Sequence, residues 1–251
     1  MIELNNISAG YGSKTILNGM TISFEKGKLT SIIGVNGCGK STLLKAILGI
    51  LPLSGGEIIV DGNGLRSMSG NEIAKKIAYL PQGKSIPDMT VGQMVLHGRF
   101  PYLSYPRRYR KDDKDMAKKA MASVGILHLA DKPLLTLSGG MRQNAYIAMA
   151  LAQDTDYILL DEPTTYLDIA HQLDLMRLLA RLGDMGKGII AVMHDLPLAF
   201  DFSDEVAVIQ NGTVAAYATP SDMYRTSVIQ EIFGVKIERL ADHKFCYAYD
   251  R

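Results

Sequence analysis

The sequence of 251 residues contains no tryptophan and only two cysteines, Cys38 and Cys246. Two thiols are too few for the disulfide framework of a small secreted domain, so we expect reduced cysteines and a cytosolic setting. The excess of positive charge that marks nucleic-acid-binding surfaces is also missing, because 27 Lys and Arg residues stand against 26 Asp and Glu residues. We therefore expect no nucleic acid among the partners.

Long apolar runs are absent as well. No stretch approaches the ~18 apolar residues that a membrane-spanning helix needs. The opening MIELNNIS lacks the basic start and apolar core of a signal peptide, so we expect neither feature. If the protein serves a membrane, it must do so through a partner protein. Its 47% apolar and 21% charged residues are ordinary for a globular protein with a sizeable core.

Patterns of secondary structure divide the chain into three parts. Strand-like segments alternate with turns and helices over about 1–82 and again over 154–225. Between them, residues 83–153 contain three helix-like stretches and no convincing strand, which predicts a helical insert in a mixed α/β core. Residues 226–251 form a small tail, and we treat residues 1–251 as a single domain because no repeat or low-complexity segment appears.

The strongest motif is GVNGCGKS, which fits G-x-x-x-x-G-K-[ST] and stands between a predicted strand and a predicted helix. Its glycines let backbone N–H groups turn toward phosphate oxygens, Lys40 adds a positive charge, and the Ser41 hydroxyl can ligate Mg²⁺. By itself the motif predicts a nucleoside triphosphate site and leaves kinases and GTPases open. Cys38 is first of all a small side chain that fits beside the phosphates. The nearby amides and Lys40 are also expected to lower the pKa of its thiol. The residues that we assign to the nucleotide are Gly34, Val35, Asn36, Gly37, Cys38, Gly39, Lys40, Ser41 and Thr42.

Two acidic residues end the strand-like segment YILLDEP. Asp161 can hold Mg²⁺, and Glu162 can orient and deprotonate an attacking water. Because an Asp-Glu pair is common at solvated strand ends, this assignment depends on the phosphate loop. His194 follows the next strand and can donate a hydrogen bond to the γ-phosphate. Gln82 follows another strand and can reach the Mg²⁺ or the water from a third side.

A second pair of glycines occurs in LSGGMRQ, residues 137–143, directly before a helix-like stretch. Each glycine costs roughly 1 kcal/mol inside a helix relative to alanine, so the pair belongs at the helix entrance. There the free backbone N–H groups attract anions. The chain therefore has two segments that are predicted to bind phosphate.

Together these motifs resemble those of the ATP-binding subunit of ATP-binding-cassette (ABC) transporters, over essentially residues 2 to 225. In the order typical of that family, the chain has GVNGCGKST (Walker A), Gln82 (Q-loop), LSGG at 137–140 (signature), YILLDEP (Walker B), YLD at 166–168 (D-loop) and His194 (switch histidine). The resemblance implies an α/β fold, with a P-loop NTPase (RecA-like) core, an N-terminal antiparallel β subdomain and an inserted α-helical subdomain. It also implies that Tyr11 stacks on the adenine.

In this family two cassettes pair head to tail, and each ATP lies between the Walker A motif of one subunit and the signature of the other. The resemblance therefore implies a homodimer that uses ATP and Mg²⁺ as cofactors. Met141 replaces the glutamine that usually follows LSGG, which calls a contact to the nucleotide's sugar into question. The remaining implied assignments are catalysis by Glu162, His194 and Gln82, Mg²⁺ binding by Ser41, Gln82 and Asp161, partner-phosphate contacts from Ser138, Gly139 and Gly140, and Asp168 in the D-loop.

Within the family, NGCGKSTLL, KKIAYLPQ, GRFPYL and TTYLDIAHQLDLM look like the branch that serves ferric-siderophore, haem and vitamin B12 importers. Iron(III)-siderophore import is the favoured function, with haem or cobalamin import as the alternative. The resemblance implies a peripheral protein at the cytoplasmic face of the cell membrane, bound to an integral permease dimer and served indirectly by an extracytoplasmic substrate-binding protein. We expect the permease to contact Gln82 and the segment through about residue 110.

A soluble ABC ATPase outside transport, as in DNA repair or translation, is the alternative from a different class. Such proteins normally carry a long coiled-coil insert or a second cassette. The predicted insert is too short for a long coiled coil, and the chain has one set of motifs. A P-loop kinase or GTPase would leave the signature unexplained.

Overall fold

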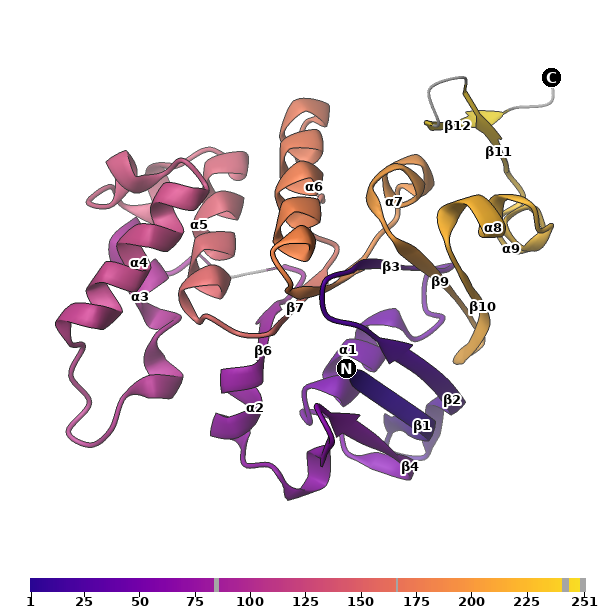
Figure 1. The fold of residues 1–251 in the computed structure, drawn as a ribbon, viewed down its shortest axis with the longest axis horizontal. Helices are drawn as coiled ribbons and strands as arrows, with labels where there is room; N and C mark the ends of the chain where they lie inside the picture. Colours follow the sequence, from indigo (N-terminus) through magenta and orange to yellow (C-terminus); the bar gives the residue numbers. More distant parts are fainter. Residues whose placement is uncertain (84–85, 166, 241–243, 249–251) are drawn as a thin grey trace.

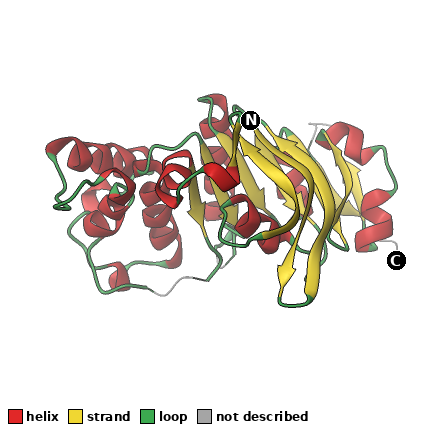
Figure 2. Ribbon diagram, turned by 90° about the horizontal axis from the view of Figure 1, so that it is seen from below, coloured by secondary structure: helices red, strands yellow, loops and turns green. Residues whose placement is uncertain are grey.

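The computed structural model of the chain describes residues 1–83, 86–165, 167–240 and 244–248. Strands gather in the middle of the molecule, and helices lie at both ends of it (Figure 2). In the described residues, no helix is long and apolar enough to cross a membrane.

The first sheet has four antiparallel strands in the order β2-β1-β4-β5. Buried side chains such as Leu4, Leu17 and Ile58 come from its three long strands and pack beneath it. One edge strand is short, with only two residues. The bounds are Ile2–Tyr11 (β1), Lys14–Phe24 (β2), Leu53–Val60 (β4) and Asn63–Gly64 (β5).

The second sheet has six strands in the order β10-β9-β3-β8-β7-β6, and every neighbouring pair is parallel except β9 with β10. All residues of β3, β7 and β8 are buried, which explains their continuous apolar sequences. The carboxyl ends of parallel strands lie at one edge of a sheet, so the segments that follow them meet there. The bounds are Leu29–Ile33 (β3), Ile77–Leu80 (β6), Tyr157–Asp161 (β7), Gly188–Val192 (β8), Glu205–Gln210 (β9) and Thr213–Ala218 (β10).

The core lies on both faces of the second sheet, because successive strand side chains point to opposite sides. Ile190 belongs to the cluster shared with the first sheet and Lys40–Ile47 (α1), whereas Ile189 belongs to the opposite cluster, beneath α6 and α7. The other helices of the core are Gly70–Lys76 (α2), Ile169–Asp184 (α6), Leu196–Phe202 (α7) and Pro220–Tyr224 (α8).

The helical insert projects from one side of the core, where Figure 1 shows α3, α4 and α5 side by side. Their bounds are Val91–His97 (α3), Lys111–Ser123 (α4) and Gly139–Ala152 (α5). Small and branched side chains, among them Val95, Ala117 and Ala148, make a third core between these helices. Short 3₁₀ turns occur at Leu65–Ser67, Phe100–Tyr102, Leu127–Leu129 and Leu134–Thr136. The expected α/β core with an antiparallel β subdomain and a helical insert is confirmed, while the proposed residue boundaries stay predictions.

The tail contains the helix Val228–Phe233 (α9) and a two-stranded antiparallel sheet of Lys236–Arg239 (β11) and Phe245–Ala248 (β12). The Phe245 ring packs edge-on against Phe200 of α7, with ring centroids 5.2 Å apart. The tail is therefore attached to the core. Residues 241–243 and 249–251 of the predicted tail lie outside the described residues.

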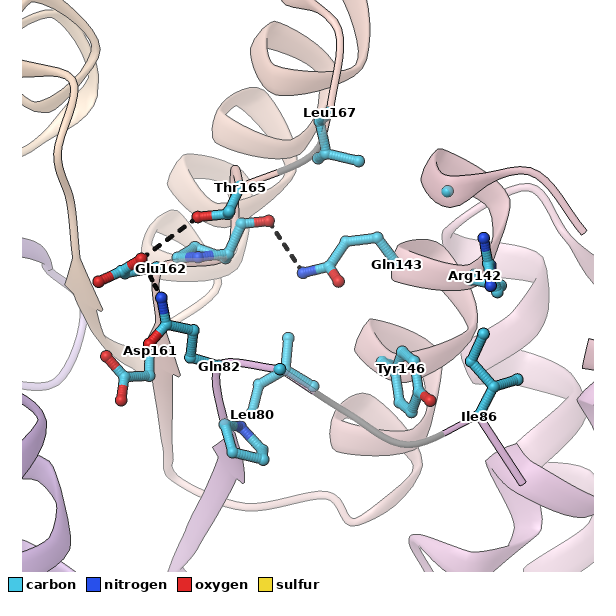
Figure 3. Close-up of a pocket in the computed structure, with 14 residues that line it drawn as sticks. Leu80, Gln82, Ile86, Arg142, Gln143, Tyr146, Asp161, Glu162, Thr165 and Leu167 are labelled. Atoms are coloured by element: carbon cyan, nitrogen blue, oxygen red, sulfur yellow. Dashed lines mark hydrogen bonds between the residues drawn. The ribbon is translucent and has the colours of Figure 1, made fainter.

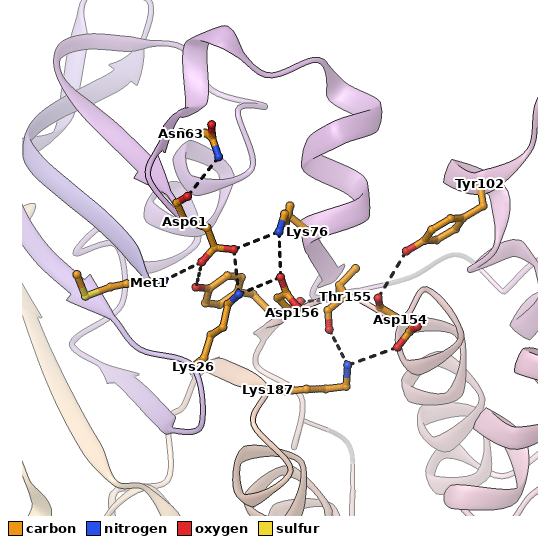
Figure 4. A network of polar contacts seen from close by, with 11 residues as sticks. Met1, Lys26, Asp61, Asn63, Lys76, Tyr102, Asp154, Thr155, Asp156 and Lys187 are labelled. Carbon is orange, nitrogen blue, oxygen red and sulfur yellow. Dashed lines mark hydrogen bonds and ion pairs between the residues drawn. The ribbon is translucent and has the colours of Figure 1, made fainter.

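A polar network joins the first sheet to the second (Figure 4). Its members are Met1, Lys26, Asp61, Lys76, Asp156 and Tyr157. Burial raises the pKa of the Asp61 carboxyl, but hydrogen bonds from the amine of Met1, from Lys26 and from Tyr157 outweigh it. The pKa of Asp61 consequently lies well below its usual range.

This lowered pKa predicts an acid-sensitive contribution to stability. A carboxyl group whose pKa is lower in the folded chain than in the unfolded chain stabilises the fold while it is ionised. This stabilisation is lost as the pH falls and the carboxylate is protonated. At pH 7 we expect Asp61→Asn to lose about 1–2 kcal/mol of unfolding free energy. The difference from the wild type should shrink below pH of about 4, measured by urea unfolding across pH. Exposed Asp131→Asn is the control, and a pH-independent difference would contradict the prediction.

Candidate active site

The phosphate loop follows β3 and leads into α1. Gly39 has a φ of +112° at the helix N-cap, a conformation that glycine adopts without a steric cost. Lys40 is 6% exposed, and its ammonium group donates to the carbonyl oxygens of Gly34 (2.7 Å) and Val35 (3.2 Å). The charge is thus fixed over the loop whose amides are predicted to bind phosphate.

Asp161 ends β7 beside the start of α1. Its Oδ1 accepts a hydrogen bond from the Ser41 hydroxyl at 3.1 Å, and its Oδ2 accepts one from the Tyr79 hydroxyl at 3.5 Å. Burial raises the pKa of Asp161, the Ser41 hydrogen bond opposes this shift, and the charge of Glu162 adds to it. Two of the three predicted Mg²⁺ ligands, Ser41 and Asp161, therefore lie in contact, and both offer the oxygen atoms that Mg²⁺ prefers.

Glu162 lies at the centre of the predicted catalytic residues. Its φ of +53° is uncommon for a residue with a side chain, and its backbone N–H donates to Val192 in β8. Oε1 of the carboxylate lies 2.5 Å from Nε2 of His194. Oε2 accepts hydrogen bonds from Gln82 and, at 3.4 Å, from Thr165 (Figure 3). Glu162 is therefore in direct contact with both of the other predicted catalytic side chains.

A pocket of about 590 Å³ collects most of the predicted nucleotide residues. Tyr11, at the end of β1, lies at this pocket and receives a 3.4 Å hydrogen bond from Lys45 of α1. Sequence reasoning missed Lys14 and Ile16, which reach the pocket from β2. They belong to no motif, and only the β1–β2 pairing brings them there. The lining residues are Tyr11, Lys14, Ile16, Asn36, Gly37, Gly39, Lys40, Ser41, Thr42, Gln82, Glu162 and His194.

The expectation that the pKa of the Cys38 thiol is lowered is wrong. Its side chain is buried, and a methyl group added at Gly34 would lie 2.6 Å from its sulfur. Burial raises the pKa of the thiol and outweighs the lowering by Lys40 and nearby N–H groups. Cys38 therefore fills space beneath the loop instead of presenting a reactive thiolate to the nucleotide.

The signature begins α5. Ser138 is the N-cap residue, its hydroxyl accepts a 3.3 Å hydrogen bond from the Met141 N–H, and Gly139 and Gly140 are the first two helical residues. None of Ser138, Gly139 and Gly140, all of which the structure describes, lines the pocket that holds Lys40 in the same chain. The phosphate loop and the signature therefore do not meet within one subunit.

A smaller cavity of about 280 Å³ lies between the insert and the core. Gln82 and Glu162 line it from the core side, and Gly139 and Gln143 line it from α5 (Figure 3). The Gln143 side chain donates to the Pro163 carbonyl oxygen at 3.0 Å. The signature helix is therefore linked to the segment that carries the catalytic glutamate.

Asp168 of the D-loop is the N-cap residue of α6. Its Oδ1 accepts hydrogen bonds from the His171 N–H at 2.9 Å and from ring Nδ1 of His171 at 2.7 Å. These two bonds hold the pKa of Asp168 below its usual value. Tyr166, the first residue of the D-loop motif, lies outside the described residues.

This fold and this set of contacts define a P-loop ATPase of the ATP-binding-cassette type. The comparisons with known proteins agree, because a sequence model of the family described as "ABC transporter" matches residues 17–165. The chain belongs to the ABC transporter family, as its motifs indicated, and it is an ATPase that binds ATP.

Curated relatives match nearly the whole chain. The petrobactin import ATP-binding protein FpuD of Bacillus anthracis is 38% identical, over 97% of this chain and 90% of that protein. The iron(3+)-hydroxamate import ATP-binding protein FhuC of Bacillus subtilis (strain 168) is 39% identical, over 99% and 95%. The ferric enterobactin transport ATP-binding protein FepC of Escherichia coli (strain K12) is 40% identical, over 92% and 86%.

Solved structures agree with the fold. A dimeric ATP-binding cassette in a post-hydrolysis state, bound to ADP and Pi, superposes with a TM-score of 0.76 at 26% sequence identity. The match covers 88% of this chain and 99% of that chain. The predicted P-loop NTPase fold is confirmed.

Proposed function

We propose that two copies of this chain hydrolyse ATP at their shared interface and thereby drive import of iron(III)-siderophore complexes through a membrane permease. One observation carries the ATPase part of the proposal. The Glu162 carboxylate contacts both Gln82 and His194 at a pocket that also contains Lys40 and Ser41. A base, its two polar neighbours and a phosphate-binding loop are thus assembled in one place.

Glu162 is the residue that orients and deprotonates the attacking water. Its unusual backbone conformation and the bond from its N–H to Val192 fix where the carboxylate lies. His194 and Gln82 approach different oxygens of that carboxylate, so both can respond to a water or a γ-phosphate placed beside it. Hydrolysis consumes the γ-phosphate that these side chains contact, which gives the site two distinguishable states.

Ser41, Asp161 and Gln82 are the residues that would hold Mg²⁺, and Tyr11 is the residue that would stack on the adenine. Bound Mg²⁺ neutralises charge on the β- and γ-phosphates. The hydroxyl of Ser41 already lies 3.1 Å from the Asp161 carboxylate, so two oxygen ligands converge at the loop. Lys40 supplies the positive charge on the other side of the phosphates.

The second half of each ATP site comes from the other copy of the chain. Ser138 and the amides of Gly139 and Gly140 form the start of a helix and do not line their own chain's nucleotide pocket. A partner's γ-phosphate would complete this anion site and exclude water from it, which strengthens each hydrogen bond. ATP therefore holds the homodimer closed, and hydrolysis releases it.

Two observations support a membrane permease as the partner: the names of the relatives and an exposed aromatic surface on the insert. The relatives described above are named as import or transport ATP-binding proteins for petrobactin, iron-hydroxamate and ferric enterobactin, which favours a siderophore cargo over haem or cobalamin. The insert exposes Phe100, Tyr102 and Tyr105, and the Arg107 guanidinium lies 4.5 Å from the Phe100 ring centroid. Aromatic residues and arginine are enriched at protein interfaces, so this surface suits a permease at the cytoplasmic face of the membrane.

Transport in proteoliposomes tests the proposal. The chain would be reconstituted with its permease dimer and given an extracytoplasmic substrate-binding protein loaded with radiolabelled ferric siderophore, haem or cobalamin. We expect uptake of a ferric siderophore that needs ATP on the cassette side and is lost with Glu162→Gln. Uptake of haem or cobalamin alone would contradict the cargo, and uptake without ATP hydrolysis would contradict the mechanism.

A further inference from the structure

His171 lies directly against the backbone of the signature. A methyl group added at Gly140 would lie 2.6 Å from Cδ2 of His171, closer than real side chains approach one another, and 3.0 Å from Nε2. The imidazole ring therefore occupies the space that a side chain at residue 140 would need. Glycine at this position lets a ring from α6 contact the first turn of α5.

The same ring is held in place by the D-loop. Oδ1 of Asp168 accepts from ring Nδ1 at 2.7 Å and from the backbone N–H of His171 at 2.9 Å. A carboxylate only accepts hydrogen bonds, so Nδ1 carries the proton. Two bonds from one residue to one oxygen leave the ring little freedom to turn away from Gly140.

Two glutamines form further hydrogen bonds from α5 and α6 to the segment between Glu162 and Asp168. Gln143 of α5 donates to the Pro163 carbonyl oxygen, and Gln172 of α6 donates to the carbonyl oxygens of Thr164 and Leu167. The chain between the catalytic glutamate and Asp168 is thus bonded to both helices. The signature, the D-loop and the start of α6 have direct contacts and can move together.

We propose that His171 is a positioning residue, which couples the D-loop to the signature so that both approach the partner's ATP as one rigid unit. This rests on the proposed function, in which the signature closes on the partner's phosphate. Ser138 and the amides of Gly139 and Gly140 bind that phosphate well only when they are already aligned, because ordering them during closure costs free energy. His171 does not line the nucleotide pocket of its own chain, and it acts through Gly140.

Dimer closure is the property to measure. In a Glu162→Gln background, analytical ultracentrifugation with ATP gives the dimer dissociation constant, and titration of dilute monomer gives its ATP affinity. We expect His171→Ala to raise the dimer dissociation constant about tenfold and to leave monomer ATP affinity within about twofold. Asp174→Ala is the matched control, because it removes another i,i+3 pair of α6, the 3.0 Å contact to Arg177, and should change neither value.

A double-variant cycle separates positioning from general destabilisation. Gly140→Ala should weaken closure because its methyl group displaces the ring. Once His171 is alanine the methyl group meets no ring, so the double variant should match His171→Ala alone instead of showing the product of both effects. Urea unfolding confirms that each variant is folded.

Two results would overturn the inference. One is a His171→Ala dimer as tight as its parent, and the other is a double variant weakened by the full product of the single effects. If the Glu162→Gln parent itself does not dimerise with ATP, the proposed function fails and this inference fails with it. The parent's behaviour thus distinguishes the two failures.

Discussion

Glu162→Gln is expected to lower the ATPase rate about thousandfold while ATP binding persists. Glutamine has nearly the same shape as glutamate, so it can keep the places of Gln82 and His194 around it, but it cannot take a proton from water. The residues predicted to bind the phosphates, such as Lys40 and Ser41, do not depend on the charge at residue 162. The loss should therefore fall on the chemical step.

Phosphate release and calorimetric ATP titration check this prediction separately. Because the γ-phosphate stays in place, the variant should also elute as a stable dimer with ATP on gel filtration, whereas the wild type should not accumulate one. Glu57→Gln, an exposed change in β4, is a suitable control. Turnover by Glu162→Gln at the wild-type rate would show that another group is the base.

Gly139→Asp is expected to abolish closure and to lower the ATPase rate at least about hundredfold, since like charges brought together at an interface cost several kcal/mol. The new carboxylate would stand at the start of α5 and face the partner's γ-phosphate. Acidic residues stabilise the first turn of a helix, so the fold should not suffer. ATP binding by the monomer should survive because Gly139 does not line that pocket.

Gly139→Asn is the matched control for this prediction, because it adds a side chain of similar size without the charge. Steady-state ATPase assays and ATP titrations of both variants would separate repulsion from crowding. We expect the asparagine variant to retain more activity than the aspartate variant. Undiminished hydrolysis in Gly139→Asp would argue against an ATP site that two chains share.

The predicted site residues lie close together in the structure because they follow strand ends at one edge of the sheet. Asp161 and Glu162 at the end of β7 and His194 after β8 were recognised from short apolar runs followed by polar residues. The sequence pattern did not predict the order of the strands in the sheet. Gln82 meets Glu162 because β6 and β7 are neighbours in the sheet, and nothing in either segment encodes that pairing.

The features that sequence reasoning missed have both local and long-range origins. Helix α2 was not predicted, although Ser69 and Glu72 form a capping box that could have indicated its start. The hairpin of β11 and β12 was also missed, because its attachment depends on Phe245 meeting Phe200 from a distant part of the chain. The Cys38 error has the same origin, since nearby charges are visible in a sequence and burial is not.

Mixing two inactive variants tests most directly whether each chain completes the other's pocket. Lys40→Ala leaves the phosphates uncompensated, Gly139→Asp blocks the signature, and each variant alone carries its defect in both sites of a homodimer. In a mixed pair, one site combines the intact Walker A motif of the Gly139→Asp chain with the intact signature of the Lys40→Ala chain. The account predicts that the mixture has a measurable ATPase rate that neither variant shows alone. A mixture as inactive as its two components would contradict it.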